Sequence, residues 1–123
     1  MRFMYIVTPA HAAPPTPELM DAVHKLAERE IKAGHMLDTG ALMPRTLGAQ
    51  VRITDGKLGV TDGPFVEAKE VIGGYAIFEL RDREEAVEKA VEFMQLHRDH
   101  MPGWEGTCEV RALVAPEANP CQI

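Results

Sequence analysis

The sequence predicts a single α+β domain, in which two helices cover one face of an antiparallel sheet. The chain has 123 residues, which is enough for one hydrophobic core and too few for two. Its 46% hydrophobic content is that of an ordinary soluble globular protein, so a disordered domain body is not expected. Segments with strand and helix patterns follow one another in the order strand, helix, strand, hairpin, strand, helix, strand.

The first strand and the first helix are predicted in the N-terminal third. Residues 3–7 form a short apolar strand, which a proline-rich loop follows. Thr16 suits the N-cap, and Pro17 suits the first helical position, where its missing N–H would be unpaired in any residue. The helix should end at Gly34. Its apolar side is predicted from residues at helical spacing, namely Leu19, Val23, Leu26, Ala27 and Ile31.

The middle of the chain predicts three further strand regions. Residues 36–43 read as a second strand, with Gly40 as a candidate for a β-bulge. Residues 51–60 alternate around Asp55-Gly56, a pair that readily adopts the positive φ angles of a tight hairpin turn. Residues 71–80 should form the longest, central strand. Gly73 and Gly74 within it indicate a bulge or the close approach of another backbone or a ligand.

A second helix and a last strand complete the domain. Asp82 and Glu85 form a capping pattern that opens the helix, which should stop before Pro102. Ala86, Ala90, Phe93 and His97 lie on one stripe of this helix, with Val87, Val91 and Met94 beside it. Residues 109–114 alternate as a final strand. The domain is therefore expected to span residues 1–115, with residues 116–123 as a loosely ordered tail.

This order of elements gives two βαβ-like halves, which predict a ferredoxin-like plait with a β-hairpin insertion. The helices would cover one face of the sheet and leave the other face exposed and apolar in a monomer. A second copy packing there would cover it, so we expect a homodimer.

Charge and hydropathy exclude several partners. The formal net charge is −6, and no stretch gathers Lys and Arg, so direct nucleic-acid binding is not expected. No stretch approaches the roughly 20 apolar residues of a membrane span, and the start has no secretory signal pattern. Two cysteines do not make a disulfide framework. The expected location is the cytoplasm.

Residues 60–75, VTDGPFVEAKEVIGGY, resemble the signature of the DGPF branch of YCII-related proteins. The resemblance extends to the MRFMYIV start, to the Asp55-Gly56-Lys57 hairpin and to the Glu109-Val110-Arg111 ending. It implies a dimeric α+β barrel, shared with families that handle small, often aromatic molecules between sheet and helices. Genes of this branch often lie beside those of extracytoplasmic-function sigma factors, which implies a possible sigma-factor association. YCII-related proteins more broadly are thought to carry a His and Asp pair in a cleft, but no motif fixes those positions here.

Asp62, Glu67 and Lys69 are candidates in this motif. The Asp62 carboxylate either accepts backbone N–H groups within the turn or lies at a cleft rim, where it acts as a base or binds a polar substrate. Glu67 and Lys69 would point to the same side of an extended segment. They form either an exposed charge pair or the entrance to a pocket.

Residues 96–104, LHRDHMPGW, gather the other reactive groups. His97 continues the apolar stripe, so it is either a satisfied core histidine or, with His100, a general acid or base. His97 and His100 are one helical turn apart, but no third ligand is identified and no metal is predicted. Trp104 either gives an aromatic wall to the site or only packs within the domain.

Tyr75 and Arg52 are candidates for substrate binding. Tyr75 either packs within its strand or presents its hydroxyl inward, and Arg52 either neutralises an anionic substrate or is surface charge. No phosphate loop, nucleophile motif or nucleotide fingerprint is present, and no cofactor is predicted.

Two hypotheses of function follow. One is a cofactor-independent lyase or isomerase that carries out acid/base chemistry on a small organic molecule, with His97 or His100 as acid or base and Asp62 as orienter or second base. The other is a non-catalytic dimer that binds a metabolite or a regulatory protein. The first requires His97 and Asp62 to meet at one cleft.

Overall fold

A computed structural model describes residues 1–44, 47–62 and 72–115. Its elements, in chain order, are β1 (Arg2–Pro9), α1 (Pro17–Lys32), β2 (Met36–Ala41), β3 (Ala49–Thr54), β4 (Lys57–Asp62), β5 (Gly74–Glu79), α2 (Arg83–His100) and β6 (Gly106–Ala112).

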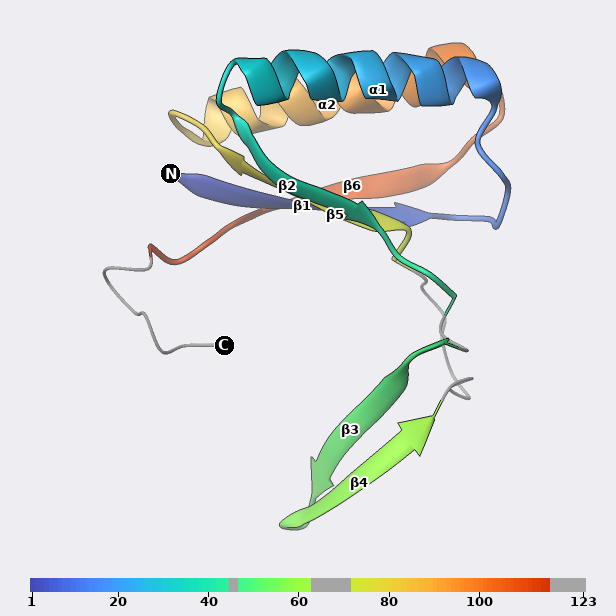
Figure 1. Ribbon diagram of the computed structural model, residues 1–123, viewed down its shortest axis with the longest axis vertical. Coiled ribbons are helices and arrows are strands. Elements are labelled where there is room, and N and C mark those ends of the chain that lie inside the picture. The colour runs from blue at the N-terminus through green and yellow to red at the C-terminus, as the bar shows by residue number, and fades with distance from the viewer. Residues whose placement is uncertain (45–46, 63–71, 116–123) are drawn as a thin grey trace.

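Four strands form one antiparallel sheet in the order β2-β5-β1-β6, and both helices lie on the same face of it (Figure 1). Strands β3 and β4 form a separate two-stranded hairpin. The predicted α+β fold, a ferredoxin-like plait with an inserted hairpin, is confirmed. Within the described residues the sheet stays open and does not close into a barrel.

Both helices begin where the capping residues predicted. The hydroxyl oxygen of Thr16 accepts a hydrogen bond from the Leu19 N–H at 3.1 Å, and the Asp82 carboxylate accepts one from the Glu85 N–H at 2.9 Å. Each bond satisfies a backbone donor that a helix leaves unpaired in its first turn. Gly34 lies just beyond α1 with φ +79°, the left-handed conformation that glycine adopts without strain.

The core lies between α2 and the middle of the sheet. Tyr5 and Phe78 contact each other edge to face, with ring centroids 5.0 Å apart. The Tyr5 hydroxyl donates to the Ala86 carbonyl at 2.7 Å, and Ala86 itself is fully buried. A small residue at this position lets α2 lie close to the sheet. The core cluster consists of Phe3, Tyr5, Phe78, Leu80, Ala86 and Ala90.

Some details of the strands differ from the prediction. The irregularity in β2 lies between Met36 and Asp38 and not at Gly40, so the bulge prediction for Gly40 is wrong. Gly40 pairs with Tyr75, and an added Cβ there would lie 2.8 Å from Tyr75 Cε1. The glycine is needed because the tyrosine ring occupies the space of its side chain.

Strand β5 is inner, as expected, but at six residues it is shorter than the eight-residue β1. At Gly74, where β5 begins, a Cβ would lie 2.8 Å from the Gly40 carbonyl oxygen, which confirms the predicted close approach of another backbone. In α1, Ile31 is 56% exposed and does not share the burial of Leu19. It lies at the C-terminal end, where the apolar stripe has turned away from the core.

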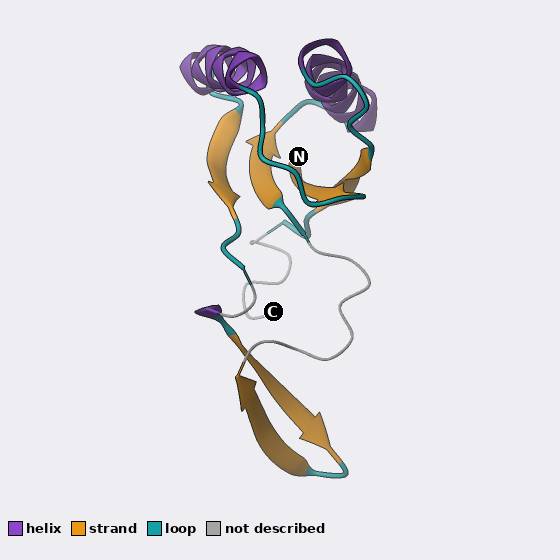
Figure 2. Ribbon diagram, turned by 90° about the vertical axis from the view of Figure 1, so that its right-hand side faces the viewer, coloured by secondary structure: helices purple, strands orange, loops and turns teal. Residues whose placement is uncertain are grey.

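None of the described elements covers the second face of the sheet. Side chains alternate along each strand, so Met4 and Ile6 point away from the face that holds Phe3 and Tyr5. Ile77, which pairs with Met4, joins them. The hairpin extends from this same side of the sheet, opposite the helices (Figures 1 and 2). Within residues 1–44, 47–62 and 72–115 no helix is long and apolar enough to cross a membrane.

Gly40→Ala should lower the free energy of unfolding by about 1–3 kcal/mol, because the added methyl group clashes with the Tyr75 ring. Urea denaturation measures the change. Gly59→Ala is the matched control, since a Cβ at Gly59 in β4 meets no described atom within 4 Å. In a Tyr75→Ala background the cost of Gly40→Ala should disappear. An equal cost in both backgrounds would contradict the steric explanation.

Candidate functional site

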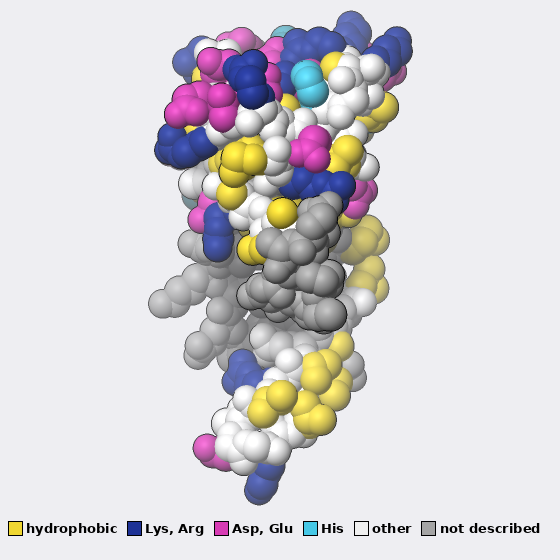
Figure 3. Space-filling model, turned by 90° about the vertical axis from the view of Figure 1, so that its left-hand side faces the viewer, with side chains coloured by type: hydrophobic (Ala, Val, Ile, Leu, Met, Phe, Trp, Pro, Cys, Tyr) yellow, Lys and Arg dark blue, Asp and Glu magenta, His cyan; other side chains and the backbone are white. Residues whose placement is uncertain are grey.

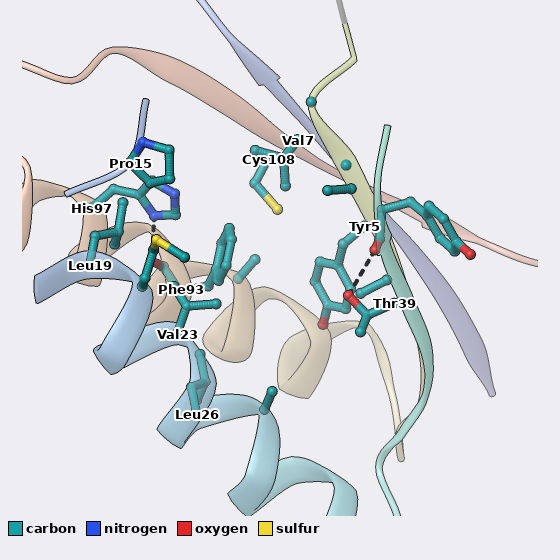
Figure 4. A pocket seen from close by; sticks show the side chains of 18 of the residues that line it. Tyr5, Val7, Pro15, Leu19, Val23, Leu26, Thr39, Phe93, His97 and Cys108 are labelled. Carbon is teal, nitrogen blue, oxygen red and sulfur yellow. Dashed lines mark hydrogen bonds between the residues drawn. The ribbon is translucent and has the colours of Figure 1, made fainter. Parts of the chain in front are cut away.

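A cavity of about 560 Å³ lies between the two helices and the helix-facing side of the sheet (Figure 4). Its volume is within the range of small-molecule sites in proteins. Helix α1 provides one wall through Leu19, Val23 and Leu26. The sheet provides the opposite wall, with Val7, Ala76 and Cys108 among its residues. Most of the lining is apolar, so the cavity suits a ligand with a largely apolar surface.

Contacts between α1 and α2 explain why there is room for a cavity. Near its start, the Thr16 hydroxyl donates to the His100 carbonyl at the end of α2, at 2.7 Å. Near its other end, Arg29 makes two hydrogen bonds to the Glu92 carboxylate, at 2.6 and 2.7 Å. The helix is therefore tied to α2 near both ends, and its apolar side between them faces the cavity.

His97 enters the cavity from α2. The residue is only 7% exposed, and its Nδ1 lies 3.0 Å from the Phe93 carbonyl oxygen (Figure 4). A carbonyl can only accept, so Nδ1 carries the proton and Nε2 holds a lone pair when the ring is neutral. Nε2 makes no hydrogen bond to a described residue, and no buried side-chain nitrogen or oxygen among those residues lacks a partner. Nε2 therefore keeps some solvent-accessible surface, and His97 is among the residues that line the cavity.

Two aromatic rings hold the imidazole in place. The Phe93 ring lies 4.6 Å from it on one side, and the Trp104 ring lies 4.4 Å away between centroids. Trp104 can fold over because residue 106 is glycine: a Cβ there would lie 2.6 Å from Trp104 Cη2. The contact between His97 and Trp104 agrees with the aromatic wall expected from the sequence, whereas the part of Gly106 was not foreseen.

The other polar side chains of the sheet wall are neutral hydrogen-bonding groups. Burial raises the pKa of the Cys108 thiol to about 11, so it stays protonated at neutral pH. Burial also raises the pKa of Tyr5 well above its ordinary value, with smaller contributions from nearby acidic groups. The Thr39 hydroxyl donates to the Tyr75 carbonyl at 3.1 Å (Figure 4). Among these three, none supplies a charge to a ligand.

A buried ion pair lies at another part of the cavity wall. Glu30 is nearly fully buried, and its carboxylate lies 2.5 Å from Lys89 Nζ, 3.3 Å from Arg29 Nε and 3.4 Å from His35 Nδ1. Burial by itself would raise the pKa of Glu30. Hydrogen bonds and charges from Lys89 and Arg29, with His35, outweigh burial and lower it. Sequence reasoning missed this pair, although Glu30 stands on the apolar side of α1, where an acidic residue is unexpected.

Of the predicted catalytic residues, His97 lines the cavity. Asp62 ends strand β4, in the hairpin on the side of the sheet opposite the helices (Figure 1). His100 ends α2 and is not among the residues that line the cavity. The Asp62 side chain lies outside the described part of the chain, so its meeting with His97, on which the paired acid/base mechanism depends, stays a prediction.

Two of the predicted substrate-binding residues, Tyr75 and Arg52, lie apart from His97. Tyr75 lines the cavity edge, but alternation along β5 puts its side chain on the uncovered face, where its hydroxyl donates to the Asp38 carboxylate at 3.1 Å. Arg52 lies on the hairpin and donates to Gln50 at 3.2 Å. Glu67 and Lys69 lie outside the described residues. Within the part of the chain that the structure describes, no group of three or more His, Cys, Asp or Glu side chains could hold a metal ion.

Comparison with known proteins places this fold in a family. A model of the YCII-related domain matches residues 1–93. An uncharacterized protein, R00369, of Rhizobium meliloti (strain 1021) is 27% identical over 107 residues, which cover 87% of this chain and 82% of that relative. The matched family region includes the cavity residues of β1, α1, β2, β5 and most of α2.

Lys89→Met should destabilise the protein by about 2–3 kcal/mol at pH 7, because Glu30 would lose its nearest countercharge while remaining buried. The pKa of Glu30 is lowered by folding, so its contribution to stability is present above its ordinary pKa and is lost as the pH falls through the folded value. The difference between wild type and variant should therefore shrink below about pH 4.

Urea denaturation at several pH values measures that difference. Lys25→Met is the matched control, because Lys25 pairs with Asp21 on α1 but is 75% exposed. Similar losses for the two variants, or a Lys89→Met loss that stays constant down to pH 3, would contradict the assignment.

Proposed function

The chain belongs to the YCII-related family, and on that premise we propose that it binds a small, largely apolar organic molecule in the cavity and transfers a proton at His97 Nε2. The observation that carries this proposal is the imidazole itself. It is buried in an apolar wall, its Nδ1 is engaged by the Phe93 carbonyl, and its Nε2 is left for a ligand.

The site favours a ligand that carries a hydrogen-bond donor. The lone pair of neutral Nε2 accepts, and the neighbouring rings of Phe93 and Trp104 offer flat surfaces to an aromatic group. A phenol or an enol satisfies both requirements, because it combines a planar apolar body with one O–H group. Cys108 and Tyr5 are protonated at neutral pH, so the sheet wall suits a ligand without a strong charge.

The chemistry that such a site supports begins with removal of a proton from carbon. Nε2 takes the proton next to a carbonyl, and the C–H electron pair becomes the enolate. Return of the proton to a different carbon is an isomerisation, and departure of a leaving group from the neighbouring carbon is an elimination. Neither step needs a cofactor.

A non-catalytic binding module is the second candidate. One observation favours it: the His97 ring is oriented by a backbone carbonyl, and the described residues bring no carboxylate to it. A base without such a partner has less to stabilise the imidazolium that proton abstraction produces. In this case the cavity binds a metabolite and reports it to another protein, for which a sigma factor is the candidate implied by the family resemblance.

Two finer assignments accompany the proposal. Residues 62–65, Asp-Gly-Pro-Phe, support membership of the DGPF branch. We also propose that two copies pair through the uncovered sheet face. Met4, Ile6 and Ile77 are half-buried apolar side chains at the centre of this face, and a facing copy would remove them from water.

Binding should depend on the ligand hydroxyl through His97. Wild-type protein should bind 4-ethylphenol about five- to tenfold more tightly than 4-ethyltoluene, which corresponds to one net hydrogen bond. Trp104, the chain's single tryptophan, lies in the cavity wall, so its fluorescence measures both affinities. His97→Phe should keep the aromatic packing and abolish the preference. His11→Phe, in an exposed loop, should preserve it; a preference that survives in His97→Phe would contradict the role of Nε2.

Proton transfer can be tested separately from binding. In deuterium oxide, the wild-type protein should accelerate exchange of the α-protons of 4-phenyl-2-butanone by about 10²-fold over buffer, the lower range for general-base catalysis. Proton NMR measures the loss of signal. His97→Phe should reduce the rate to that of buffer, while His11→Phe should not. Wild-type protein that binds phenols but shows no exchange would support the non-catalytic candidate instead.

A further inference from the structure

The hairpin β3-β4 has one apolar side that no described part of the chain covers. Val51 pairs with Val60 and Ile53 pairs with Leu58, so these four side chains lie on the same face of the two-stranded ribbon. They are 66–74% exposed. The other face carries polar residues such as Gln50, Thr54 and Lys57. Figure 3 shows the hydrophobic side chains gathered along one side of the hairpin.

An isolated two-stranded hairpin is at best marginally stable in water, and four exposed aliphatic side chains add a cost. The alternation is nevertheless regular over residues 50–54 and 57–61, which is the pattern of a strand pair that buries one face. This pattern indicates that the apolar face of the hairpin packs against another protein surface. Among the described elements of its own chain, it makes only minor contacts.

We propose that the apolar face of the hairpin packs against a second copy of this chain, so that each copy holds the other with its hairpin. The direction of the hairpin supports this partner. It extends from the side of the sheet opposite the helices, which is the side where a second copy facing the uncovered sheet would lie (Figures 1 and 2). The inference rests on the sheet-face pairing proposed above.

The area of the sheet supports the same partner. Four strands spaced about 4.8 Å apart, each about 20 Å long, give a flat face of about 380 Å², whereas a stable interface buries about 800 Å² per partner. The hairpin adds a face of about 200 Å². Pairing through the sheet alone thus gives about half of a standard interface, and the hairpin raises the combined face to about 580 Å², about three quarters of it.

The symmetry of a dimer also supports a second copy of the chain as the partner. Each chain has two uncovered apolar surfaces, one on the sheet and one on the hairpin. A two-fold dimer is self-complementary, so it can cover both surfaces on both chains with a single kind of partner. A different protein bound to the hairpin would leave the sheet face exposed.

Sedimentation equilibrium of the full chain tests the proposal. Ile53→Thr combined with Leu58→Thr should raise the dimer Kd at least about a hundredfold, because two hairpins lose two apolar contacts each, while threonine keeps the strand preference. The control is Gln50→Thr combined with Lys57→Thr on the polar face, which should change Kd by less than about threefold. A wild-type chain that is monomeric at about 10 µM, or equal effects of the two double variants, would overturn the proposal.

Cross-linking identifies the surface that the hairpin contacts. Ile53 is replaced by the photoreactive p-benzoylphenylalanine, and chains labelled with ¹⁴N and ¹⁵N are mixed. The expected product joins the two isotopic forms; a cross-link found only within one chain would overturn the proposal.

A sheet-face variant separates this inference from the pairing on which it rests. Ile6→Arg should weaken the dimer if the sheets face each other. In one outcome, Ile6→Arg leaves the dimer Kd unchanged and Ile53→Thr with Leu58→Thr raises it. That result would contradict the sheet pairing and support the hairpin contact. If instead Ile6→Arg raises the Kd and the hairpin double variant leaves it unchanged, the sheet pairing is supported and the hairpin contact is contradicted.

Discussion

Helix α1 is tied to helix α2 near both of its ends, by the Thr16 hydroxyl at its start and by Arg29 and Glu30 near its close. These polar contacts fix the distance between the helices, and Ala86 fixes the distance between α2 and the sheet. The apolar side of α1 then spans the space that remains, and this space is the cavity. A polar framework between the helices thus defines an apolar site, and the buried carboxylate of Glu30 is part of that framework.

The packing of α2 also determines which group orients the His97 ring. An imidazole can be oriented by a carboxylate, as in many hydrolases, or by a backbone carbonyl, as here. Both fix the tautomer, but a carbonyl brings no negative charge to stabilise the protonated ring. The His97 site therefore suits recognition of a hydroxyl and proton transfer of modest difficulty. The aromatic rings of Phe93 and Trp104 add orientation for a planar ligand rather than electrostatic stabilisation.

Close contacts at two glycines leave room for aromatic rings from elsewhere in the chain. Gly40 leaves room for the Tyr75 ring on the uncovered face, where the hydroxyl bonds to Asp38. Alternation along β5 directs the Tyr75 side chain away from the helices, although the residue lines the cavity edge. Gly106 has the opposite effect, because it lets Trp104 lie against His97 and close one end of the site. In both cases a glycine positions an aromatic ring that lies elsewhere in the sequence.

The sequence by itself determined the elements and their caps. Thr16, Pro17, Asp82 and the Asp55-Gly56 turn act within a few residues, so their consequences can be derived locally, and the order of elements then limits the topology. The stripe of α2 also showed that His97 would face the sheet. Only the tertiary structure decided what meets His97: it brought the Trp104 ring, which lies beyond the end of α2, against the imidazole. Glu30 and Lys89 were equally unforeseeable, since a charged residue on an apolar stripe reveals no partner 59 positions away until two helices pack together.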